Sequence, residues 1–149
     1  MRTIVTEFEK VIEELKKQNR LDKKALIEPN FYLSYEKLYK NILTLATKVI
    51  EKTNKNEVVG IVTNRGVSTV VAMFACIYAN NPYVVIDVES PKQRVNKIIE
   101  VAKPKLILVD KHNQNQWDFF QDIASICVDI TYNDACYDKS LIKKRLEKM

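Results

Sequence analysis

The chain has 149 residues, of which 46% are hydrophobic and 29% are charged, a composition typical of one globular domain and unlike that of a disordered segment. Its net charge of +5 comes from 24 basic and 19 acidic residues that are interspersed except near the C-terminus, so we expect no nucleic-acid partner. No apolar run approaches the roughly 20 residues of a membrane span, and the N-terminal segment mixes acids with lysines as no secretory signal does, so we expect no membrane partner.

The first third of the chain predicts two amphipathic helices with a short hairpin between them. Apolar residues recur at helical spacing from residue 4 to residue 15. Residues 25–28 and 31–34 are strand candidates on either side of Pro29-Asn30, which is a turn signal. Ser34 is suited to cap the next helix. The apolar face of that helix is formed by Leu38, Ile42, Leu45 and Val49.

From residue 58 onward, predicted strands and helices alternate. The strands are expected at residues 58–63, 83–88, 105–110 and 125–130. Helices are expected at residues 67–79, 90–102 and 138–149, and a polar segment at residues 113–123 leads to a further short helix. Ser90 is expected to cap the helix at 90–102, with Pro91 at its first position. The last helix is expected to be capped near Asp138, and one of its sides is formed by Leu141, Ile142, Arg145, Leu146 and Met149. The alternation predicts one α/β domain over residues 1–149, with a doubly wound, mostly parallel sheet and helices on both faces.

Ligands of open parallel sheets bind beyond the carboxyl ends of the strands, so the residues that follow each strand are the candidates for a site. These residues are Thr63, Asn64, Arg65, Asp87, Asp110, Lys111 and Asp129. A phosphoacceptor receiver domain needs an acidic pair after its first strand to hold Mg²⁺, and the segment GIVTNRG supplies none. Neither Gly60 nor Gly66 lies in a phosphate-binding loop of known pattern.

The remaining reactive residues do not form a catalytic group either. Ser68 and Ser125 lack the GxSxG setting of a hydrolase nucleophile. Three cysteines, Cys76, Cys127 and Cys136, form no ligand cluster with the single histidine, His112. We therefore assign no catalytic, cofactor-binding or metal-ligating residue, and we expect a reduced, cytoplasmic protein.

Residues 33–50, LSYEKLYKNILTLATKVI, resemble a motif and the helix after it near the start of adenylate-forming enzymes. The family motif is Leu-Thr-Tyr-x-Glu-Leu. Leu33, Tyr35 and Leu38 match it, whereas Ser34 is a mild change and Lys37 stands where glutamate is usual.

Residues 77–94 resemble a second motif of the same family, Leu-Lys-Ala-Gly-x-x-Tyr-Val-Pro-(Leu/Ile)-Asp-Pro-x-Tyr-Pro-x-x-Arg. The matching residues are Tyr83, Val84, Asp87, Pro91 and Arg94. Asn80 replaces the family's glycine, and Val85 and Val88 replace two prolines. Asn80 tolerates the left-handed conformation that glycine usually supplies.

With both motifs in order, the chain resembles the N-terminal portion of an AMP-binding enzyme, most like the amino-acid adenylation domain of a nonribosomal peptide synthetase or its D-alanine ligase relatives. The resemblance runs from about residue 5 to residue 130 and onward toward the end. It implies an ATP-dependent, acid-activating ligase family, and it implies packing and local hydrogen bonds for Tyr83, Asp87 and Arg94. The family's phosphate loop, ribose-binding aspartate and catalytic lysine are not found in these residues, so ATP and Mg²⁺ are expected only for a complete enzyme.

Three hypotheses follow for the function. The first is a truncated or split adenylation domain that does not adenylate alone. The second is a non-enzymatic module for protein binding or assembly, and the third is a small-ligand domain that uses Asn64, Asp87 or Asp110. Because the segment at 67–79 is apolar nearly all round, we also expect either a homo-oligomer or a protein partner that supplies the missing half.

Overall fold

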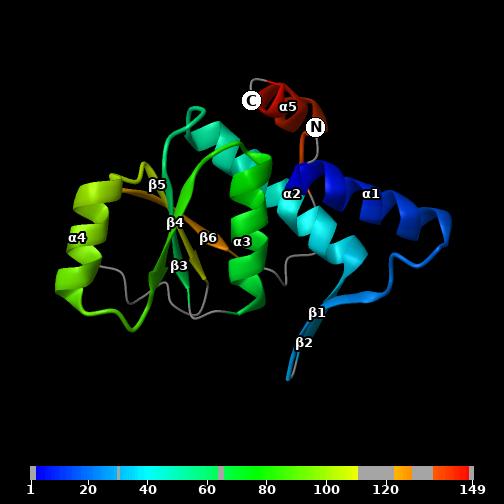
Figure 1. Ribbon diagram of the computed structural model, residues 1–149, viewed down its shortest axis with the longest axis horizontal. Coiled ribbons are helices and arrows are strands. Elements are labelled where there is room, and N and C mark those ends of the chain that lie inside the picture. The colour runs from blue at the N-terminus through cyan, green and yellow to red at the C-terminus, as the bar shows by residue number, and fades with distance from the viewer. Residues whose placement is uncertain (1–2, 30, 64–65, 111–122, 129–135, 148–149) are drawn as a thin grey trace.

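A four-stranded parallel sheet lies at the centre of the protein, and helices cover both of its faces (Figure 1). The computed structural model describes residues 3–29, 31–63, 66–110, 123–128 and 136–147. The helices are α1 (Ile4–Lys17), α2 (Tyr35–Lys52), α3 (Val67–Tyr78), α4 (Lys92–Ala102) and α5 (Lys139–Leu146). The strands are β1 (Lys24–Glu28), β2 (Phe31–Ser34), β3 (Val59–Thr63), β4 (Tyr83–Asp87), β5 (Leu106–Asp110) and β6 (Ala124–Val128).

The strand order in the sheet is β4-β3-β5-β6, and every neighbouring pair is parallel. The chain leaves β3 through α3 to reach β4 on one side, and it then returns through α4 to β5 on the other side of β3. α3 and α4 lie on opposite sides of the sheet in Figure 1. The predicted doubly wound α/β fold is therefore confirmed.

Alternate side chains of each strand enter two different cores, as the period of two in a β-strand requires. Leu106 and Leu108 of β5 pack with α2 and α3 in the larger core, whereas Ile107 and Val109 pack under α4 with Val95. β5 is buried along four successive residues because both faces are covered.

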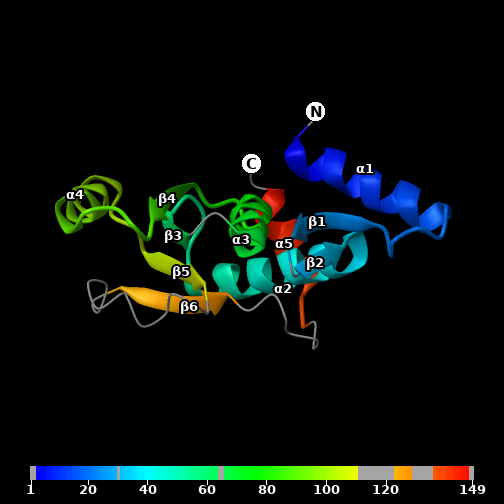
Figure 2. The ribbon, with the colours of Figure 1, turned by 90° about the horizontal axis from the view of Figure 1, so that it is seen from below.

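β1 and β2 form a separate antiparallel hairpin that projects away from the sheet (Figures 1 and 2). Leu26 pairs with Leu33 on the side that packs against the larger core. Ile27 pairs with Tyr32 on the other side, where both side chains are exposed. The hairpin predicted around Pro29-Asn30 is thus present, with one apolar face directed outward.

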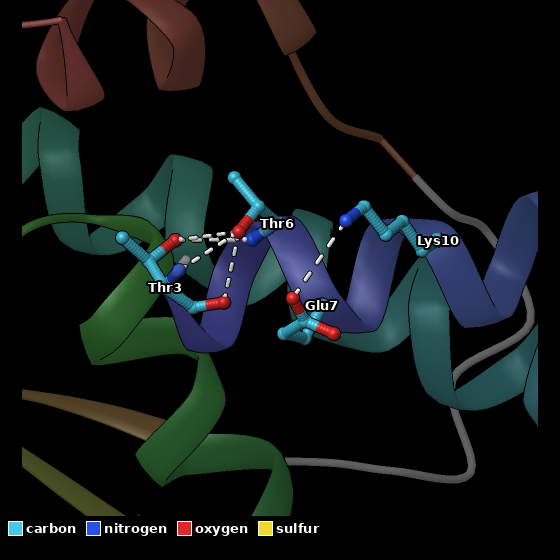
Figure 3. A network of polar contacts seen from close by, with 4 residues as sticks. All are labelled: Thr3, Thr6, Glu7 and Lys10. Atoms are coloured by element: carbon cyan, nitrogen blue, oxygen red, sulfur yellow. Dashed lines mark hydrogen bonds and ion pairs between the residues drawn. The ribbon is translucent and has the colours of Figure 1, made fainter. Parts of the chain in front are cut away.

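Caps define the ends of several helices. At α1, the Thr3 hydroxyl accepts from the Thr6 N–H at 3.1 Å while the Thr6 hydroxyl accepts from the Thr3 N–H at 2.8 Å (Figure 3). In the next turn of α1, Lys10 Nζ lies 3.8 Å from Glu7 Oε1. The predicted caps Ser34 and Asp138 are confirmed, since each side chain accepts a backbone N–H three residues ahead.

Several predicted element boundaries differ from the structure by a few residues. Pro91, not Ser90, caps α4, and the helix begins at Lys92, because the extended backbone of Pro91 stays outside the helix. β6 begins at Ala124, one residue before the predicted strand. The predicted short helix within residues 113–123 falls almost wholly outside the described residues.

α3 is the deeply buried helix that its composition predicts. None of its residues is exposed, and Met73 and Phe74 are half-buried against the larger core. Contacts with α1, α2, β1, β3 and β5 cover it. In the described part of the chain, no helix combines the length and apolarity needed to cross a membrane.

Candidate functional site

The carboxyl ends of β3, β4 and β5 lie at one edge of the sheet, where a doubly wound fold places its ligand crevice. Thr63 stands opposite Asp87 in the β3–β4 register. Val62 stands opposite Val109, so Asp110 lies one residue beyond that pair. The structure therefore brings Thr63, Asp87 and Asp110 to the same edge, as the sequence predicted, whereas Asn64, Arg65, Lys111 and Asp129 lie outside the described residues.

Two carboxylates occupy the N-terminus of α3 at this edge. Glu28, the last residue of β1, accepts a hydrogen bond from the Val67 backbone N–H at 2.6 Å. Asp110 accepts a hydrogen bond from the Ser68 hydroxyl. The first N–H groups of a helix lack partners within the helix and carry partial positive charge, so a carboxylate stabilises them as a bound anion would. The protein thus supplies its own anions at this helix end.

Asp87 has a local structural role in the turn between β4 and α4. Its Oδ1 accepts from the Glu89 backbone N–H at 2.9 Å, and its carbonyl accepts from the Ser90 N–H at 3.1 Å. This geometry matches the local hydrogen bonding expected for Asp87 from the family resemblance. Arg94 is exposed on α4, and Tyr83 packs half-buried against the larger core.

The sequence did not indicate Glu28 or Ser68 as partners in this region. Ser68 could have been recognised from its position two residues after Gly66, in the first turn of a predicted helix. Glu28 gave no signal, because only the hairpin brings it to Val67, 39 positions further along the chain.

The described residues at this carboxyl edge include two acidic side chains that bind groups of α3. Glu28 and Asp110 place two acidic side chains beside the backbone amides that a phosphate would need. Across the described residues, no three Asp, Glu, His or Cys side chains are grouped to hold a metal ion.

We predict that the chain alone binds ATP weakly, because its carboxylates compete with phosphate for the α3 N-terminus. Isothermal titration calorimetry with MgATP should show no saturable binding in the micromolar range. A measured affinity of about −8 kcal/mol, which corresponds to a micromolar Kd, would show a phosphate site elsewhere in the chain. The Glu28→Gln variant serves as a control, since it removes one of the competing charges.

A second polar cluster connects α1 to α2 and to the C-terminal end of α3. Glu9 accepts hydrogen bonds from the Tyr39 hydroxyl at 2.8 Å and the Tyr78 hydroxyl at 3.0 Å. Burial, reinforced by the Glu9 carboxylate, raises the pKa of both phenols well above the ordinary tyrosine range. Both tyrosines therefore remain protonated donors, and the cluster is structural.

Of the three cysteines, Cys76 lies in a setting that disfavours reactivity. Cys76 is fully buried in α3, and burial raises the pKa of its thiol to about 12. Cys127 is half-buried, Cys136 is exposed, and no disulfide joins any of the three. Cys76 is thus a small residue of the core.

Residues 12–148, which are nearly the whole chain, match the family model of the AMP-binding enzymes. The chain belongs to the AMP-binding enzyme family. Among curated AMP-binding relatives, tyrocidine synthase 1 of Brevibacillus parabrevis is 31% identical over 91 residues and gramicidin S synthase 1 of Brevibacillus brevis is 32% identical over 89 residues. These matches cover 60% and 59% of this chain and 8% of each relative, so the chain spans a small part of their length.

Solved AMP-binding structures share the fold. The nonribosomal peptide synthetase FmoA3, bound to α-methyl-L-serine-AMP, aligns with a TM-score of 0.74 at 20% identity over 87% of this chain and 14% of its own. A fatty acyl-adenylate ligase from Legionella pneumophila aligns with a TM-score of 0.66 at 18% identity over 81% of this chain and 24% of its own. The family resemblance inferred from the two sequence motifs is confirmed.

Proposed function

We propose that these 149 residues form the N-terminal scaffold of an amino-acid-activating adenylation domain and do not adenylate an acid by themselves. The observation that supports the proposal most is the family match over residues 12–148, which covers scaffold motifs of the fold. The relatives named as tyrocidine and gramicidin S synthases favour an amino acid as the substrate class.

The polar groups at the carboxyl edge are consistent with a scaffold. Glu28, Asp87 and Asp110 each bind a group of their own chain. Adenylation needs the ATP phosphates held in line with a carboxylate and charge stabilised on the leaving pyrophosphate. We infer that further residues, in the same polypeptide or in a second one, supply those functions in the complete enzyme.

We predict that the purified chain catalyses no acid-dependent exchange of pyrophosphate into ATP. The assay uses a panel of amino acids and aryl acids, with a complete adenylation domain as the positive control. Robust exchange by the 149-residue chain alone would contradict the scaffold proposal. Exchange that appears only after a polypeptide with the missing functions is added would support it.

An assembly role is the second candidate, and the exposed face of the hairpin favours it. Ile27 is 70% exposed and Tyr32 is 51% exposed, and the two stand directly opposite each other in the β1–β2 register. The buried α3 does not supply such a surface, since its own neighbours cover it. We propose that Ile27 and Tyr32 contact the remainder of an adenylation domain.

We predict that the chain self-associates or retains a protein partner through Ile27 and Tyr32. Light scattering across a concentration series should show a mass that rises with concentration, and the Ile27→Ser, Tyr32→Ser double variant should reduce it. Val101→Ser is the matched control, because Val101 is exposed on α4, away from the hairpin. A strictly monomeric mass up to high micromolar concentration, with no partner recovered by pull-down, would refute this proposal.

A further inference from the structure

Arg145 joins the last helix, α5, to the rest of the protein through hydrogen bonds. Through Nη1, Arg145 of α5 donates to the Ala79 carbonyl at 3.1 Å and to Asn81 Oδ1 at 3.0 Å. Through Nη2, it donates to the Ile50 carbonyl at 3.1 Å and to the Thr53 carbonyl at 2.7 Å. Four of the five N–H donors of a guanidinium are therefore used.

Three of the four acceptors are carbonyls at the C-terminal ends of two helices that converge on the guanidinium. Ile50 lies in the last turn of α2, Thr53 caps that helix, and Ala79 caps α3. The last carbonyls of a helix have no partner within the helix and carry partial negative charge. A cation between two such ends makes charge-assisted hydrogen bonds to both.

The fourth acceptor is held in place by its own hydrogen bonds. Asn81 is only 4% exposed, and its Nδ2 donates to the Asn54 carbonyl at 3.1 Å and the Glu57 carbonyl at 2.8 Å. With both amide hydrogens used, Oδ1 is directed toward Arg145. Asn80, in the left-handed conformation at φ 59°, donates from Nδ2 to the Arg145 carbonyl at 3.3 Å.

We propose that the Ile50, Thr53 and Ala79 carbonyls and Asn81 Oδ1 form a guanidinium-specific site, and that its occupation by Arg145 holds α5 on the amino edge of the sheet. A planar fork reaches acceptors on both helix ends at once, whereas a lysine ammonium is a compact charge with three donors and reaches fewer of them. The specificity thus follows from the spread of the four oxygens. We refer to them as the guanidinium site.

α5 depends on this attachment because it is short. A helix of eight residues is not stable alone in water, so its order comes from docking. Ile142 is buried in the larger core, and the Asp138 N–H donates to Thr47 Oγ1 at 3.1 Å. The guanidinium site supplies the directional part of this docking and Ile142 supplies the apolar part.

The test is chemical rescue of the Arg145→Ala variant in the 149-residue chain. Loss of the charged hydrogen bonds should lower Tm by about 5–10 °C. Adding about 10 mM methylguanidinium should recover part of the lost Tm, as binding to the folded state requires. Methylammonium at the same concentration should not. In the Arg145→Ala variant, the backbone amide hydrogens of α5 should exchange faster than those of β3 and β5.

Two further variants separate the site from general charge effects. Arg145→Lys should lower Tm nearly as much as Arg145→Ala, whereas Lys144→Ala, on an exposed neighbour, should leave Tm unchanged. If Arg145→Ala does not fold, refolding only in the presence of methylguanidinium supports the proposal. An unchanged Tm for Arg145→Lys, or equal rescue by methylammonium and methylguanidinium, or no rescue by either, would overturn it.

Discussion

Replacing Leu108 by alanine is expected to lower the free energy of unfolding by about 2–5 kcal/mol. Leu108 is 0% exposed and lies in β5, one of the two central strands. It pairs with Ile61 on one side and Ile126 on the other, and its side chain packs into the larger core. The substitution removes the transfer free energy of the lost carbons and leaves a cavity that rigid neighbours fill only in part.

Urea denaturation followed by circular dichroism measures this loss. We expect one cooperative transition for the wild type and for the variant, with the midpoint shifted and the slope unchanged. Val101→Ala is the control, since Val101 is 76% exposed and its truncation leaves no cavity. A loss below about 1 kcal/mol for Leu108→Ala would mean that β5 is not in the core.

Replacing Gly60 by valine is expected to destabilise the protein by about 1–3 kcal/mol. Gly60 lies in β3 and faces the smaller core, and an added Cβ would come within 2.7 Å of Ile107 Cδ1. Ile86 Cδ1 and Pro104 Cβ would each lie 3.7 Å from the added Cβ, in ordinary van der Waals contact, so Ile107, which is fully buried in the smaller core, is the side chain that must shift. The higher strand propensity of valine offsets only part of this crowding.

A double-mutant cycle identifies the cause of the crowding. The Ile107→Val substitution removes the Cδ1 atom, so Gly60→Val should cost less in that background, with a coupling energy above about 0.5 kcal/mol. Gly60→Ala should show a smaller loss than Gly60→Val in the wild-type background, because it adds only the Cβ. A Gly60→Val variant as stable as wild type, or a cost that Ile107→Val leaves unchanged, would show that the close approach is not limiting.

The sequence by itself determined which segments are helices and strands, because burial imposes a period on neighbouring residues. The buried face of α2 that includes Leu38, Ile42, Leu45 and Val49, and the continuous apolar run of β5, follow from the local spacing of apolar side chains. Ser34 and Asp138 were predictable as caps because a cap is a local interaction, in which the side chain accepts a backbone N–H three residues away. The family motifs were also readable, because their residues are close together in the chain.

Only the tertiary structure decided which polar side chains meet. The amphipathic pattern placed Arg145 on a helix face, and its four acceptors lie between 64 and 95 positions earlier in the chain. Glu28 likewise reaches Val67 only because the hairpin folds toward the start of α3. A hydrogen bond carries no periodic signal in the sequence, and its partners are fixed by how the helix ends and strand ends pack. The occupation of the α3 N-terminus by the chain's own carboxylates, and with it the candidate site, therefore had to come from the fold.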